Sequence, residues 1–146
     1  MSTVMSVAER EEFLAGVHVG VLGVVAASGA DVLAVPVWYR YEPGGDVVLV
    51  TGRDSLKARL IRAAGRFSLC AQEESEPYRY VSVQGPAVVE DDGGNLEEHR
   101  ALAHRYLPPP AAEAYLAGTD FDLSQTVTIR MRPERWYSAD FSKQAG

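Results

Sequence analysis

Polar and apolar residues follow two periods along this chain, and the changes of period predict its elements. Alternating or continuous β-branched and aromatic runs, each ended by glycine, proline or acidic residues, indicate strands. These runs cover residues 17–27, 32–41, 47–51, 66–72, 78–89, 125–132 and 135–141. The pattern therefore predicts six or seven strands.

Helical spacing occupies the remaining stretches. Ser6 to Glu9 has the pattern of a capping box, which predicts a helix running to about Gly16. Apolar residues recur every three or four positions between 95 and 107, and a proline triplet then breaks that helix and starts a shorter one ending near Leu116.

Short turns join most of the predicted strands. The sequence Glu42-Pro43-Gly44-Gly45-Asp46 predicts a hairpin between the second and third strands. Strands do not alternate with helices as parallel βαβ units require. We therefore expect a mainly β protein, an antiparallel barrel or curved sheet with peripheral helices, formed as a single domain by residues 1–146.

Composition narrows the function classes. The formal net charge of -6 and the pI near 5.0 argue against partners that are nucleic acids or anionic membranes. No long apolar run and no secretory leader is visible, and a single cysteine forms no internal disulfide, so we expect a cytoplasmic location. Cys70 lies in an apolar strand and is predicted to be a small core residue.

Positive charge gathers at one place against this acidic background. A helix opens after Gly52 with Asp54 or Ser55 as its N-cap, and four basic residues flank or follow its start: Arg53, Lys57, Arg59 and Arg62. A helix N-terminus with adjacent cations suits a phosphate group. Helical geometry places Lys57 within the apolar stripe of Leu56, Leu60, Ile61 and Ala64. Lys57 is then either an anion ligand or a lysine extending to water from a surface helix.

Three segments together resemble a known family. They are Val35-Pro36-Val37-Trp38-Tyr39, the segment Thr51 to Arg59, and Trp136 to Phe141. They resemble the pyridoxamine 5'-phosphate oxidase-like split β-barrel proteins, a fold similar to that of FMN-binding proteins. Within that family the chain looks closest to deazaflavin-dependent oxidoreductases, which use coenzyme F420. The resemblance implies a homodimer with two cofactor sites at the subunit interface.

The resemblance also implies site residues. Thr51, Ser55 and Lys57 would bind the cofactor phosphate with help from Arg59, and Val35, Pro36, Val37 and Trp38 would lie against its ring. Pro36 donates no ladder hydrogen bond, which predicts a locally unpaired or bulged strand or, alternatively, an ordinary edge strand. Arg79 and Tyr80 would reach the cofactor of the neighbouring subunit, or else they are rim residues of a barrel strand. Trp136 lies near the interface, covers the pocket, or packs in the core.

Three hypotheses for function follow. The first is an F420-dependent reductase of a small unsaturated or conjugated molecule. The second is an FMN-binding flavin or nitro reductase. The third is a non-catalytic carrier of a cofactor, haem or another tetrapyrrole. His18, His99 and His104 do not have the spacing of a metal site, and no catalytic residue is expected because the cofactor supplies the chemistry.

Overall fold

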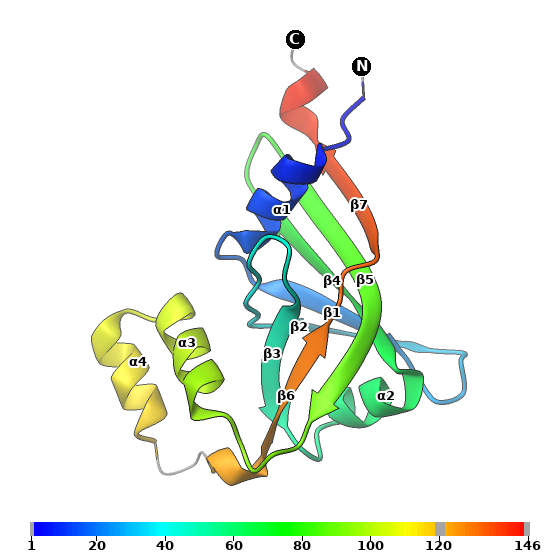
Figure 1. Ribbon diagram of the computed structural model, residues 1–146. Helices are drawn as coiled ribbons and strands as arrows, with labels where there is room; N and C mark the ends of the chain where they lie inside the picture. Colours follow the sequence, from blue (N-terminus) through cyan, green and yellow to red (C-terminus); the bar gives the residue numbers. More distant parts are fainter. Residues whose placement is uncertain (1, 119–121, 145–146) are drawn as a thin grey trace.

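The computed structural model describes residues 2–118 and 122–144, and it is mainly β (Figure 1). The strands are β1 (Gly20–Val25), β2 (Val32–Val37), β3 (Val47–Gly52), β4 (Arg66–Glu73), β5 (Arg79–Glu90), β6 (Thr126–Met131) and β7 (Arg135–Asp140). The α-helices are α1 (Val7–Ala15), α2 (Leu56–Ala64), α3 (Leu96–Tyr106) and α4 (Pro109–Leu116). Short 3-10 turns follow at Leu123–Gln125 and Phe141–Gln144. The predicted fold class is confirmed.

All strand pairs are antiparallel, in the order β2-β1-β4-β5-β6-β3, with β7 added beside β5. The long strand β5 belongs to both halves of the curled sheet. Its first part pairs with β4 and β7, and its last residues, Ala87 to Glu90, pair with β6. Figure 1 shows β5 bending from the upper part of the molecule to the lower part, while α3 and α4 stand to one side.

The predicted hairpin between β2 and β3 is wrong as a strand pairing. The turn itself forms, with Gly45 N–H donating to Glu42 O at 2.8 Å. However, β2 and β3 lie at opposite ends of the strand order, and only the bridge between Arg40 and Val48 joins this stretch to β3. Next to this bridge, Tyr39 N–H donates to the hydroxyl of Tyr106 in α3.

Strand β2 carries no bulge, so one prediction for Pro36 is wrong. Its register with β1 is uninterrupted, from Val37 opposite Gly20 to Val32 opposite Val25, and Pro36 faces Val21. The alternative interpretation is confirmed: β2 is an edge strand, whose open side tolerates a residue without an N–H donor.

The core fills the inside of the curled sheet. Alternate residues of successive strands point inward and are fully buried, among them Leu22, Leu49, Leu69, Val81 and Ile129. Burial of such side chains is the main favourable term in folding. The N- and C-terminal ends lie together beside β7, where Asp140 N–H donates to Thr3 O (Figure 1).

Burial corrects two of the side-chain predictions. Cys70 is half-buried because it points to the outer face of β4, not into the core. In α2 the buried residues are Ala58 and Ile61, and Leu56 is 48% exposed, so the apolar stripe is rotated from the predicted one.

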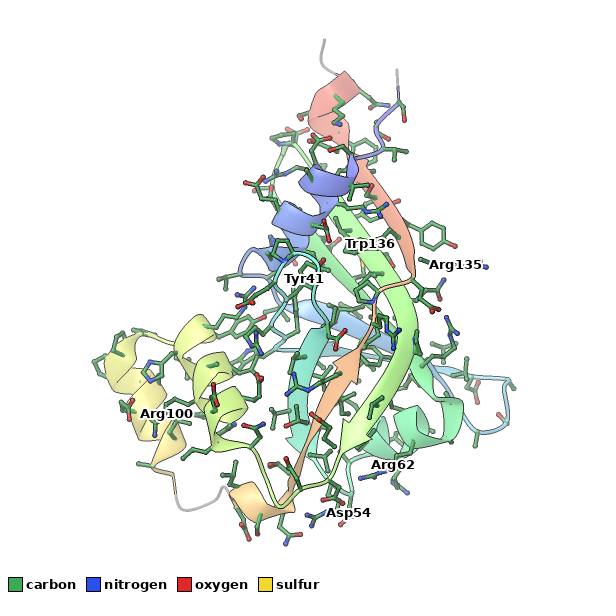
Figure 2. The ribbon with its side chains drawn as sticks, viewed as in Figure 1. Tyr41, Asp54, Arg62, Arg100, Arg135 and Trp136 are labelled. Atoms are coloured by element: carbon green, nitrogen blue, oxygen red, sulfur yellow. The ribbon has the colours of Figure 1, made fainter. Side chains whose placement is uncertain are left out.

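Of the three alternatives for Trp136, the structure shows packing in the core. It packs against the core, edge-on to Tyr41 at 6.0 Å between ring centroids, with the Arg10 guanidinium 4.7 Å from its own centroid. Figure 2 shows Trp136 and Tyr41 near each other on the inner side of the sheet, whereas Arg135 points away from it. Among the residues that the structure describes, no helix has the length and apolar character needed to cross a membrane.

Candidate functional site

A cavity of about 300 Å³ opens where β3 ends beside α3 and α4. Five predicted site residues line it: Pro36, Val37, Trp38, Thr51 and Lys57. The remaining lining includes Gly52, His99, Leu102, Ala103, Tyr115 and Thr126. Residues as far apart in sequence as Pro36 and Thr126 therefore converge here, because the curled sheet brings the ends of β2 and β3 together. The volume is at the lower limit for a small-molecule site.

The start of α2 forms one end of the cavity. Ser55 is the N-cap, and its hydroxyl oxygen accepts from Ala58 N–H at 3.2 Å. The Thr51 hydroxyl donates to the same oxygen at 3.2 Å, which fixes the end of β3 against the helix. The first-turn N–H groups of a helix lack intrahelical partners and carry partial positive charge. This end of the cavity is therefore suited to an anion.

Two of the basic residues near the start of α2, Arg53 and Arg62, donate hydrogen bonds to backbone carbonyl groups. Arg53 forms an ion pair with Asp91 at 2.8 Å and donates to Ser124 O at 2.7 Å. Arg62 donates to Arg53 O at 2.8 Å. The Arg53 guanidinium, through its hydrogen bond, holds the pKa of the Asp91 carboxyl below its usual value. Figure 2 shows Arg62 and Asp54 beside this turn, at the base of the molecule.

Lys57 differs from these arginines. It is half-buried in the cavity wall and has no ion pair within residues 2–118 and 122–144. A half-buried ammonium without a carboxylate partner is costly unless water or a bound anion solvates it. Among the basic residues near the start of α2, Lys57 is the one that lines the cavity in the part of the chain that the structure describes, and it stands in the first turn of the helix.

The opposite end of the cavity is aromatic and uncharged. Trp38 stacks on Tyr106 with ring centroids 5.0 Å apart and lies 5.7 Å from Tyr115 of α4. His99 of α3 lies 5.4 Å from Tyr115. Burial lowers the pKa of His99, so its imidazole is neutral near pH 7. The cavity therefore joins a cationic end to a neutral aromatic end.

Two predicted residues lie just behind the cavity wall and one lies outside it. Val35 packs inward against the core beside Val37, and Ser55 supports Thr51 through the hydroxyl contact. Arg59 is solvent-exposed on α2 and does not line the cavity. Its assisting role at the phosphate stays a prediction.

Arg79 and Tyr80 lie away from this cavity. Arg79 forms an ion pair with Glu73, covers the Phe13 ring at 5.1 Å, and lines a separate hollow beside α1. Tyr80 is 36% exposed on the outer face of β5. Their predicted role concerned the cofactor of a neighbouring subunit, so it stays a prediction.

Sequence reasoning missed the wall that α3 and α4 contribute. The sequence pattern assigns His99 to a helix and Tyr115 to the short helix after it, but neither to a cavity. Helical periodicity did indicate an amphipathic helix over 95–107, and its buried face carries His99, Leu102 and Ala103. Nothing local in the sequence indicates that this face closes a cavity at β3.

A phosphate-bearing planar cofactor fits these residues. Its phosphate suits Lys57, Thr51 and the first turn of α2, and its ring suits the uncharged wall formed by Pro36 and Trp38. Because the cavity volume is about 300 Å³, part of such a cofactor extends beyond it.

The curled antiparallel sheet with its peripheral helices is that of a split β-barrel protein. The sequence profile of the pyridoxamine 5'-phosphate oxidase family matches residues 6–137, and the chain belongs to that family. The predicted family is thereby confirmed. No curated protein is similar enough to this chain to match.

Solved structures agree on the fold. A conserved hypothetical protein from Mycobacterium tuberculosis, Rv2991, superposes with a TM-score of 0.77 at 24% identity, over 99% of this chain and 91% of that one. An F420 reductase gives 0.69 at 23% identity, over 87% and 94%. An FAD-binding protein from Mesorhizobium loti gives 0.64 at 20% identity, over 92% and 93%. At these identities the likeness establishes the fold alone.

Proposed function

We propose that the protein is an oxidoreductase that uses coenzyme F420 to reduce a small unsaturated or conjugated molecule. The observation that carries the proposal is the pairing, in one cavity, of Lys57, which has no ion pair among the described residues, and a neutral aromatic wall around Trp38. That pairing suits a cofactor with a phosphate at one end and a planar ring at the other. The F420 reductase of the same fold gives independent support.

The protein's own residues bind the cofactor and orient its ring. Lys57 and the first turn of α2 hold the phosphate, which fixes the position of the ring along the cavity. Pro36 and Val37 present a flat apolar surface without acidic groups, which excludes water from that side of the ring. When bound, the reduced deazaflavin supplies a hydride to an electrophilic carbon, and a proton from solvent completes the two-electron reduction.

FMN is the second candidate cofactor. It also carries a phosphate and a planar ring, and an FAD-binding protein shares the fold. The two cofactors differ in ring chemistry and in the tail beyond the phosphate. Direct binding separates them.

Replacing Lys57 by alanine is expected to weaken F420 binding roughly 10-fold or more, because a charge-assisted contact to phosphate is lost. The measurement is a titration of purified protein with F420, and separately with FMN, followed by cofactor fluorescence. We expect the unaltered protein to prefer F420.

Lys143 supplies a matched control. It is the other lysine of the chain, and it pairs with Glu9 at 2.8 Å, away from the cavity. Lys143→Ala is expected to bind F420 as the unaltered protein does. Equal affinity in Lys57→Ala would remove Lys57 from the site, and a preference for FMN would assign the protein to the flavin branch.

The outer face of the upper sheet supports a homodimer. Strand register places Pro36, Val21, Cys70, Ser82 and Tyr137 in one row across five strands, and none of them is charged. An uncharged row of this width is unusual on a chain with a net charge of -6. We propose that a second copy covers this face. Pro36 belongs both to the row and to the cavity wall, so the partner would border the cofactor.

Introducing a charge in this row tests the dimer. Val21 is 42% exposed at its centre, and Val21→Glu is expected to convert the dimer to a 15.9 kDa monomer in sedimentation equilibrium at micromolar concentration. Val88, 64% exposed on the lower part of β5, provides the control, and Val88→Glu should leave the dimer intact. A monomeric unaltered protein would refute the shared site.

A further inference from the structure

The Trp38 ring already packs against two other aromatic rings. Tyr106 of α3 stacks on it nearly parallel, with the ring centroids 5.0 Å apart and an interplanar angle of 9°. Tyr115 of α4 is inclined to it by 53°, with the centroids 5.7 Å apart. The cavity volume of about 300 Å³ is at the lower limit for a small-molecule site. A cofactor ring that lies against Trp38 therefore has to displace one of the two tyrosines.

Tyr106 is the tyrosine that is held in place. Its hydroxyl accepts from Tyr39 N–H at 3.0 Å, and its oxygen lies 2.6 Å from the carbonyl oxygen of His18. Helix α3, which carries Tyr106, is also anchored at both ends. Near its start, Glu98 forms a half-buried ion pair at 2.6 Å, and near its end Arg105 donates to two carbonyl oxygens at the end of α1. Moving Tyr106 aside would break these bonds.

Helix α4 is held less firmly than α3. Pro108 stands at its N-cap, where proline offers no side-chain acceptor, and Pro109 and Pro110 have no N–H to bond to α3. Along its eight residues, Ala112 is buried and Leu116 is half-buried, while the others are exposed. Figure 1 shows α4 beyond α3, at the outer margin of the molecule. A helix of this length has little stability of its own.

The polar link from α4 to α3 is exposed to water. Glu113 of α4 contacts Arg100 at 3.2 Å and His104 at 2.8 Å, and the Glu113 side chain is 57% exposed. Ion pairs as exposed as these contribute little to stability. Of the two helices that carry a tyrosine to Trp38, α4 is therefore the one that moves at small cost, and Tyr115 moves with it.

We propose that α4 is a gate over the cavity. In the closed form Tyr115 covers Trp38, and in the open form α4 has moved away from α3, so that the planar ring of the cofactor takes the place of Tyr115. The inference rests on the proposed function, which supplies the cofactor. Because only the open form admits the ring, the apparent affinity is lowered in proportion to the fraction of protein that is open.

The rate of F420 association tests the gate. Tyr115→Ala removes the ring that covers Trp38, so it is expected to raise the association rate constant roughly 5-fold, the equivalent of one aromatic contact, and to lower Kd in proportion. The chain has two tryptophans, so in a Trp136→Phe background Trp38 alone reports binding by stopped-flow fluorescence.

Tyr78 supplies the matched control, because it is 50% exposed on another surface. Tyr78→Ala should associate with F420 at the rate of the background protein. An unchanged association rate in Tyr115→Ala, together with faster release of F420, would make Tyr115 a residue that contacts the bound cofactor. That outcome would overturn the gate.

Amide hydrogen exchange tests the gate without any ligand. The amides of α4 are expected to exchange about 10-fold or more faster than those of α3, and Tyr115→Ala should accelerate exchange in α4 alone. Equal exchange in the two helices, or equal acceleration by the substitution, would mean that they open together and would overturn the gate. If neither F420 nor FMN binds, the proposed function fails, and hydrogen exchange alone decides whether α4 is a gate.

Discussion

Gly85→Ala is expected to destabilise the protein by about 3 kcal/mol or more, the upper range for overpacking a core position. A Cβ atom at this position of β5 would lie 1.8 Å from Arg132 O and 2.9 Å from its carbonyl carbon. Both are backbone atoms, so no side-chain rotation relieves the clash.

The surrounding hydrogen bonds prevent a simple shift. Arg132 N–H donates to Pro86 O, and Glu134 N–H donates to Gln84 O, each at 3.0 Å. These bonds hold the link between β6 and β7 across Gly85. Gly85 also lies where β5 passes from its pairing with β7 to its pairing with β6. Alanine must therefore displace the connection between the two halves of the sheet.

Thermal unfolding measures this effect. A loss of 3 kcal/mol lowers Tm by roughly 10 °C in a domain of this size. Gly52→Ala is the matched control, because a Cβ there would meet its nearest atom at 4.0 Å. That variant should stay within about 1 kcal/mol of the unaltered protein. If Gly85→Ala unfolds at the same temperature as Gly52→Ala, the close approach of the β6–β7 link is not present in solution.

The elements were predictable because their signals are local. Alternation placed the strands within a few residues of where they occur, since one face of each strand is buried and the other is not. Ser55 and Asn95 cap α2 and α3, as small polar residues before an apolar helical stretch predict. The Gly85 constraint was not predictable, because it depends on Arg132, which is distant in sequence.

Local sequence patterns did not indicate which strands pair, nor that aromatic residues form a wall of the cavity. Turn residues predicted a β2–β3 hairpin, but in the described structure the pairing is limited to the bridge between Arg40 and Val48. Tyr106 of α3 bonds Tyr39 N–H and stacks on Trp38, a contact between residues far apart in sequence that no local pattern indicates. The cationic end of the cavity was predictable, because Thr51, Ser55 and Lys57 are neighbours in sequence. The end of the cavity formed by α3 and α4 was not predictable, because it depends on contacts between residues near 40 and residues near 106.

Glu98 is the residue that fixes this second end, and Glu98→Gln is expected to cost about 2–3 kcal/mol of stability. Its side chain is 11% exposed and joins two arginines from the sheet region. Arg40 Nη2 donates to Glu98 Oε1 at 2.6 Å, and Arg130 Nη2 lies 3.4 Å from the same oxygen. The arginine side chains are 27% and 30% exposed, so water compensates part of the loss and keeps the cost at this level.

The amide of glutamine keeps the size of the side chain but turns one acceptor into a donor that faces the guanidinium groups. The N-terminus of α3 would then lose its anchor, although the Asn95 cap, which accepts from residue 98 N–H at 3.1 Å, remains. Because the next residue, His99, lines the cavity, we expect weaker cofactor binding together with lower stability. Chemical denaturation and the fluorescence titration with F420 measure the two effects.

Glu113→Gln is the control that distinguishes loss of the Glu98 anchor from a general loss of negative charge on α3 and α4. Glu113 pairs with Arg100 and His104, but its side chain is 57% exposed, and exposed pairs contribute little to stability. Salt sharpens the contrast, since about 0.5 M NaCl screens the exposed pairs and leaves the half-buried network largely intact. The cost of Glu98→Gln should therefore persist at high salt while that of Glu113→Gln disappears. If the cost of Glu98→Gln instead falls at high salt as that of Glu113→Gln does, Glu98 is an ordinary surface charge, and the α3 wall depends on its apolar contacts alone.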